Sequence, residues 1–166
     1  MSIFNITPPP SEMDKRDEVL TKAYSNLIYF GRAFLPNDFL KKSESAPFHY
    51  EMGKKMIDTT PGARICNIIP RGHGKSVVAK AAIMHKLCFA ADDQQHFIAW
   101  VSEEQSQAID HLKYIRSHFE NNKMIRYYFG NMDGGSVGKR WTEKDLVTPK
   151  GDRVISKGTS QRLRGR

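Results

Sequence analysis

The sequence has few cysteines, no long apolar segment and little negative charge near its end. Cys66 and Cys88 are the only two cysteines in 166 residues, and each lies in an apolar stretch without a paired CxxC motif. A disulfide scaffold or a cysteine-ligated zinc site is therefore not indicated, and we expect two reduced, buried thiols. No apolar run is longer than five residues, whereas a membrane span needs about 20. We expect an intracellular protein without a membrane partner.

Basic side chains outnumber acidic ones by 26 to 18, and this excess is unevenly distributed. Residues 139–166 carry nine basic and three acidic side chains. Clustered Lys and Arg suit a polyphosphate partner, because each neutralised phosphate releases counterions. The charge favours a nucleic acid as a partner, with Lys150, Arg153 and Lys157 as candidate DNA-binding residues. A solvated basic face with no partner would have the same composition.

Apolar periodicity and turn residues predict an α/β protein with a helical lead-in. Prolines 8–10 predict an extended arm over residues 1–10. Residues 11–60 form the lead-in and residues 61–166 the main core. We predict helices over 11–34, 47–57 and 76–90, and a further helix that starts with a capping box at 102–105. The first helix would begin with an N-cap at Ser11–Asp14 and bury Leu20, Tyr24, Leu27, Ile28 and Phe34.

Two short apolar runs, 63–69 and 96–101, predict buried strands, and two shorter strands around 149–152 predict a hairpin. The order strand, helix, strand, helix is that of a βαβ unit. We therefore expect a mainly parallel central sheet with helices on both faces, which makes three layers.

The loop from Pro70 to Ser76, with the sequence PRGHGKS, lies between the first predicted strand and the next helix. Glycines let backbone amides turn toward an anion, and the helix N-terminus behind them favours negative charge. In such a P-loop the lysine reaches the β- and γ-phosphates and the hydroxyl binds Mg²⁺. The pattern predicts binding of ATP and Mg²⁺ by Arg71, Gly72, His73, Gly74, Lys75 and Ser76, with Ser76 as the metal ligand. Ile69 replaces the first glycine of the usual motif, so a helix start without a ligand is the alternative.

Arg71 is the second informative residue of this loop. Its guanidinium would repel the ammonium of Lys75 unless an anion lay between them, which makes Arg71 and Lys75 candidate catalytic residues at the γ-phosphate. His73 is more simply explained as an exposed spacer than as a proton carrier.

The loop resembles the Walker A variant of the large terminase subunits, the DNA-packaging motors of tailed bacteriophages. The similarity extends over nearly the whole chain after Ser11. It implies a P-loop NTPase fold of the ASCE type, with Phe48 and His49 on the adenine side of the nucleotide. It also implies ATP hydrolysis that drives double-stranded DNA into a procapsid in the cytoplasm of an infected bacterial host. The implied partners are sister subunits in a ring, the portal protein and the small terminase subunit.

The family also has an Arg-Gly pair just before its Walker B segment, where Arg164 stands here. The resemblance implies that Arg164 reaches the nucleotide of a neighbouring subunit as a catalytic finger, with Arg162 and Arg166 as competitors and a plain basic tail as the alternative. Walker B itself, four apolar residues and then Asp-Glu, is missing. The nearest segment, 98–104, has Ser102 in place of the aspartate and is better explained as a strand and a helix start.

The resemblance therefore implies the N-terminal part of a terminase ATPase domain, truncated before Walker B and without the nuclease domain. We expect such a piece to hydrolyse ATP poorly by itself. Two other interpretations stay open. The chain could be a short non-hydrolysing module that binds nucleotide, DNA or sister subunits, or it could belong to another class of P-loop NTPase, such as a helicase or a kinase.

Overall fold

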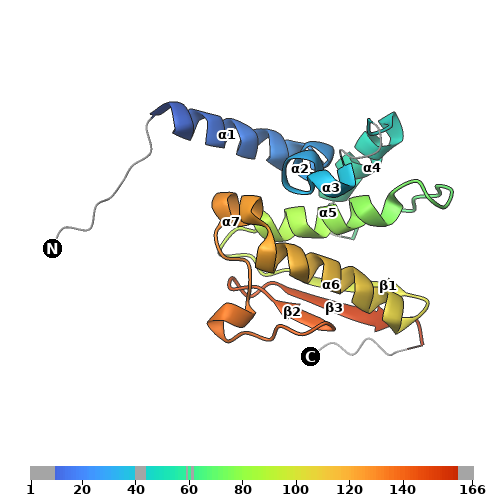
Figure 1. Ribbon diagram of the computed structural model, residues 1–166. Coiled ribbons are helices and arrows are strands. Elements are labelled where there is room, and N and C mark those ends of the chain that lie inside the picture. The colour runs from blue at the N-terminus through green and yellow to red at the C-terminus, as the bar shows by residue number, and fades with distance from the viewer. Residues whose placement is uncertain (1–9, 40–43, 59, 61, 161–166) are drawn as a thin grey trace.

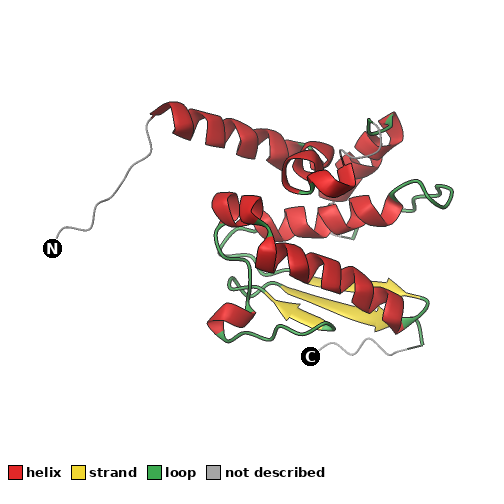
Figure 2. Ribbon diagram, viewed as in Figure 1, coloured by secondary structure: helices red, strands yellow, loops and turns green. Residues whose placement is uncertain are grey.

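The computed structural model describes residues 10–39, 44–58, 60 and 62–160, and these form a mixed α/β structure (Figures 1 and 2). The helices are α1 (Pro10–Ser25), α2 (Leu27–Phe34), α3 (Pro36–Phe39), α4 (Pro47–Ile57), α5 (Lys75–Cys88), α6 (Gln105–Asn121) and α7 (Lys123–Phe129), with a 3-10 turn, η1 (Gly135–Val137). The strands are β1 (Phe97–Ser102), β2 (Asp145–Val147) and β3 (Arg153–Gly158). The predicted α/β composition is confirmed for this part of the chain.

The described strands form one small mixed sheet with the order β1-β3-β2. β1 runs parallel to β3, in a register that pairs Phe97 with Arg153. β2 runs antiparallel to β3, and the amide of Thr148 donates to the carbonyl of Asp152 at 2.8 Å to close the turn between them. The predicted hairpin is confirmed. The sheet contains one parallel and one antiparallel pairing, so the expected mainly parallel sheet is only partly present.

Helices cover one face of this sheet, as Figure 2 shows. Trp100 of β1 packs on His111 of α6, with ring centroids 4.4 Å apart, and Val154 of β3 is fully buried. The opposite face leaves Phe97 61% and Val101 46% exposed. Over the described residues, helices therefore lie on one face of the sheet, and the expected helices on both faces are not seen there.

The segment 63–69 forms an exposed loop, so the predicted buried strand is wrong for this structure. Ile68 is 93% exposed and the thiol of Cys66 is exposed as well. A strand requires a neighbour that satisfies its amides and covers its side chains, and no described strand pairs with this segment. The expectation of a buried Cys66 fails for the same reason, whereas Cys88 on α5 is buried as predicted.

The helix predicted over 11–34 is divided in two at Asn26. This residue has an extended backbone, with φ −139° and ψ 105°, and its side chain accepts a hydrogen bond from the Tyr29 amide at 3.0 Å. An asparagine that caps a helix in this way competes with continuation of the preceding one. Leu27, Ile28 and Phe34 are buried as predicted, but Tyr24 is 63% exposed. The side chains of Ser11 and Asp14 lie outside the described part.

The helix α4 has the predicted bounds, and α5 begins and ends within two residues of them. The capping box predicted at 102–105 is wrong. α6 begins at Gln105, with Glu104 as N-cap and no capping hydrogen bond from its side chain. Ser102 cannot start the helix because it is the last residue of β1, where it pairs with Gly158.

The core lies where α5 contacts the lead-in helices α2 and α4 on one side and α6 on the other. Fully buried side chains come from all three layers of this packing: Leu27, Phe30, Phe34, Met84, Leu87, Leu112 and Ile115. Burial of each such side chain contributes about 1.5–3 kcal/mol. This packing fixes α5, and hence the loop that precedes it.

Candidate functional site

The candidate nucleotide loop, 70–76, turns sharply before α5. Gly72 and Gly74 have φ values of +81° and +73°, a conformation that glycine adopts without strain. Gly74 is the N-cap of α5 and provides no capping side chain. Its carbonyl accepts from the Val78 amide at 3.0 Å, so the helix starts regularly. The first amides of α5 are therefore without a side-chain cap, as in helix starts that bind anions.

Lys75 folds back over this loop. Its Nζ donates to the carbonyl of Ile69 and, at 2.7 Å, to that of Pro70. The ammonium group thus lies over the backbone that enters the turn, and it is half-buried. A phosphate oxygen would be a stronger acceptor for this group than a neutral carbonyl.

The other predicted loop residues lie at the surface. Arg71 is exposed, and the Nδ1 of His73 donates to the Arg71 carbonyl at 2.9 Å. His73 therefore stabilises the turn locally, in agreement with an exposed spacer. Ser76 is exposed in the first turn of α5.

A Mg²⁺ ion at this loop would have to be shared with a nucleotide, because the described side chains supply few ligands. In the described residues, no group of three or more His, Cys, Asp or Glu side chains could hold a metal ion. Mg²⁺ in nucleotide sites takes much of its coordination from phosphates and water. The Ser76 hydroxyl beside Lys75 would supply the protein ligand.

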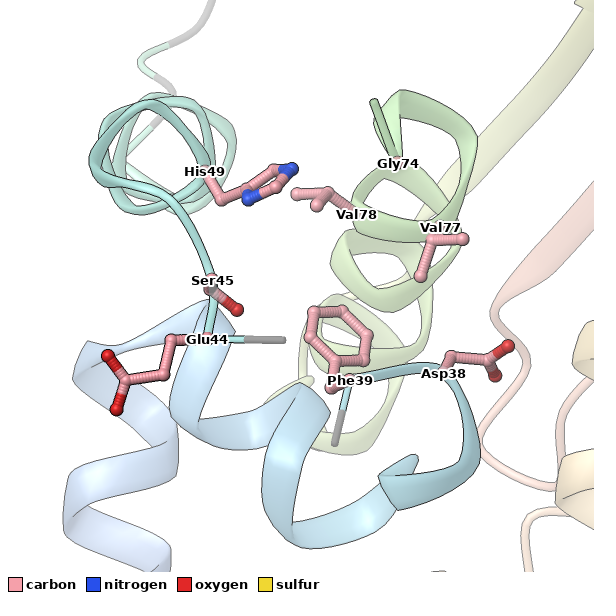
Figure 3. Close-up of a pocket in the computed structure, with 8 residues that line it drawn as sticks. All are labelled: Asp38, Phe39, Glu44, Ser45, His49, Gly74, Val77 and Val78. Carbon is pink, nitrogen blue, oxygen red and sulfur yellow. The ribbon is translucent and has the colours of Figure 1, made fainter. Parts of the chain in front are cut away.

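The predicted adenine-side residues lie next to this loop. Phe48 and His49 pack with ring centroids 4.1 Å apart, and Phe48 lies 6.3 Å from the His73 ring. His49 also lines a cavity of about 120 Å³ between α3, α4 and the start of α5 (Figure 3). The residues around the cavity are Asp38, Phe39, Glu44, Ser45, His49, Gly74, Val77 and Val78.

A polar cluster behind this cavity was not predicted from the sequence. The hydroxyl of Tyr114 on α6 donates to the carboxylate of Asp38, and the Nζ of Lys80 lies 3.6 Å from the centroid of the Tyr114 ring. Burial raises the pKa of Tyr114 and lowers that of Lys80. The cluster connects α3, α5 and α6. No local motif could have indicated it, since Asp38 and Tyr114 are 76 positions apart.

The candidate DNA-binding residues differ in what they contact. Lys150 donates to the Ala90 carbonyl at 2.9 Å and pairs with Asp92 at 3.0 Å. Arg153 makes two hydrogen bonds to the carboxylate of Asp145, at 2.9 and 2.7 Å. Lys157, on the same strand as Arg153, has no ion pair with any described residue. Arg162, Arg164 and Arg166 lie outside the described residues.

The segment considered for Walker B, 98–104, forms the end of β1 and the entry to α6. The carboxylate of Glu104 accepts from the Ser106 hydroxyl at 3.1 Å, and the Glu103 carbonyl accepts from the Thr159 hydroxyl at 3.3 Å. Both acidic residues are exposed. Their arrangement agrees with the interpretation as a strand and a helix start.

No protein-family model, no curated protein and no solved structure matches this chain. Within the described residues, no helix has both the length and the apolar character needed to cross a membrane.

Proposed function

We propose that this chain binds Mg-ATP through the loop 70–76 and is the ATP-binding part of a viral DNA-packaging motor of the terminase large subunit kind. The nucleotide site rests on one observation. Two glycines in the left-handed region precede an α5 N-terminus without a side-chain cap, and the Lys75 ammonium lies over the same loop. Backbone amides and a lysine that converge on one turn suit the tail of a nucleoside triphosphate.

Three loop residues, Lys75, Ser76 and Arg71, have roles in this proposal. The triphosphate takes the place of the Ile69 and Pro70 carbonyls as the partner of Lys75. Ser76 binds Mg²⁺, and the exposed Arg71 closes on the γ-phosphate. The fold around the loop would be that of a P-loop NTPase, with further strands beside those described here.

Calorimetric titration with Mg-ATP tests the nucleotide site. The wild-type chain should bind, and Lys75→Ala should abolish measurable binding, because the variant removes the ammonium group that hydrogen-bonds to the loop backbone. Lys86→Ala is the matched control, since it removes a lysine from the last turn of the same helix. Equal affinity in the Lys75 variant and the wild type would refute the site.

The motor function depends on the resemblance of the loop and on the basic charge of the chain. A motor piece should bind duplex DNA with a salt-dependent affinity. Glu103 and Glu104 lie at the entry to α6, where they belong to a helix start and not to a Walker B pair. This favours a second candidate, a module that binds nucleotide without turnover. Because the chain lacks Walker B, the two are distinguished by fusing a downstream Walker B segment to it and measuring the release of phosphate from ATP by the fusion, with and without duplex DNA. Turnover accelerated by DNA supports the motor, and binding without any turnover supports the module.

A further inference from the structure

His49 connects α4 to the candidate nucleotide loop. Its Nε2 lies 2.9 Å from the carbonyl oxygen of His73, and its Nδ1 lies 3.1 Å from the amide nitrogen of Ala46. An amide can only donate, so Nδ1 is the acceptor and carries no proton. The proton of the neutral ring is therefore on Nε2, which donates to His73. Figure 3 shows the imidazole pointing from α4 toward Gly74 and Val78.

The loop is shaped to receive this ring. A Cβ atom at Gly74 would lie 3.3 Å from the Nε2 of His49, which is a tight contact, and the φ of +73° already disfavours any other residue there. At Gly72, by contrast, an added Cβ would meet nothing within 4 Å. The loop is thus held on the His49 side of the turn and open at Gly72.

The bond from His49 controls the direction of one backbone amide. The His73 carbonyl and the Gly74 N–H belong to the same trans peptide group and point in opposite directions. When His49 holds the carbonyl toward α4, the Gly74 N–H has to point away from α4. Rotation of this peptide group would turn both.

We propose that His49 is a positioning residue of the nucleotide loop, rather than a contact for the base alone. Its Nε2–H orients the peptide between His73 and Gly74 before the ligand arrives, so that the Gly74 amide faces the phosphate. The inference rests on the proposed nucleotide site. Because this peptide group is already oriented, less conformational entropy is lost when the nucleotide binds. Loss of one such hydrogen bond should weaken Mg-ATP binding by about three- to tenfold.

Two substitutions of His49 test the roles of its two ring nitrogens one at a time. In His49→Asn the short side chain keeps an acceptor near Nδ1 for the Ala46 amide, but no donor reaches the His73 carbonyl. In His49→Gln the amide NH₂ group reaches the place of Nε2 and can donate to that carbonyl. Both variants are neutral. The glutamine variant should keep the loop geometry, and the asparagine variant should keep the start of α4.

The experiment combines calorimetry with Mg-ATP and hydrogen exchange of the loop amides in the ligand-free chain. We expect His49→Asn to bind about three- to tenfold more weakly and to exchange the amides of residues 74–76 faster. His49→Gln should stay within about twofold of the wild type. Exchange in α6, which is not part of the loop, checks that both variants are folded.

The possible failures are distinguishable. If the wild type binds Mg-ATP and His49→Asn binds equally well, or if both variants are equally weak, the positioning role is overturned while the nucleotide site stands. If the wild type binds no Mg-ATP, the proposed function and the role of His49 in it both fall, whatever the exchange rates show.

Discussion

The Nε2 of His85 on α5 lies 3.0 Å from the carbonyl oxygen of Tyr24 and 3.1 Å from that of Ala23, at the end of α1. Carbonyl oxygens only accept, so Nε2 carries the proton and His85 caps the last turn of α1. The ring is buried, and Phe30 packs edge-on against it with centroids 5.3 Å apart. One buried histidine thus connects the lead-in helices to the helix that carries the loop.

This contact predicts that stability decreases in mild acid. Burial lowers the pKa of His85 below its ordinary value of 6.5. The unfolded chain therefore takes up this proton at a higher pH than the folded chain does. The contribution of His85 to the free energy of unfolding is complete above about pH 6.5, and it decreases as the pH falls toward the pKa of His85 in the folded state. Burial also lowers the pKa values of His111 and His118, which act in the same direction.

Urea unfolding at several pH values between 5 and 8 tests this prediction. His85→Gln keeps a donor for the two carbonyls and removes the titration. The free energy of unfolding should therefore depend less on pH in the variant than in the wild type. Equal pH dependence in both proteins would contradict the role of His85.

Asn122 predicts a second effect on stability. Its Oδ1 accepts from the amides of Met124 and Ile125, which begin α7, and its Nδ2 donates to the Phe34 carbonyl at 2.7 Å. Asn122→Ala should lower the free energy of unfolding by about 1–3 kcal/mol, from the lost cap and an unsatisfied carbonyl. Asn122→Ser keeps a capping oxygen and should lose less. Equal losses in the two variants, measured by chemical denaturation, would exclude the contribution of the cap.

The two cysteines predict different reactivities. Cys66 is exposed on the 63–69 loop, whereas burial raises the pKa of the Cys88 thiol. A thiol reagent should label Cys66 quickly and Cys88 only when the protein opens. Cys66→Ser should remove the fast phase, and Cys88→Ser should leave it unchanged. A slow Cys66 would mean that the segment is covered in solution, as a strand would be.

Lys157 should contribute more to DNA binding than Arg153. Arg153 is held in an ion pair with Asp145, which Arg140 shares, while Lys157 has no ion pair in the described structure. Lys157→Ala should reduce the slope of log K against log salt by about 1. Arg153→Ala should change it less. Fluorescence anisotropy with duplex DNA at several salt concentrations measures both slopes, and a larger change from Arg153 would reverse the assignment.

Features that depend on neighbouring residues could be predicted from the sequence. Pro47 at the first helical position defines the start of α4, and Gly74 followed by an apolar helical pattern defines that of α5. The turn before Arg153 likewise predicts the hairpin. Each of these features depends on residues a few positions apart, and the covalent chain keeps such residues close together in any fold.

Features that depend on a distant partner could not be predicted. The segment 63–69 has the composition of a strand, but its state depends on whether another strand lies beside it. Asn26 ends one helix because its side chain caps the next, and an uninterrupted helix was equally compatible with the apolar pattern. The contacts between His49 and His73 and between Asp38 and Tyr114 join positions 24 and 76 residues apart.

By itself, the sequence determined the α/β composition, the starts of α4 and α5 and the glycine-lysine loop, because short-range sterics and apolar spacing act within one or two turns of chain. Only the tertiary structure decided which strands pair, which face of the sheet is covered and which histidine holds the loop. Those outcomes depend on burial and hydrogen bonding between segments that meet only once the chain is folded.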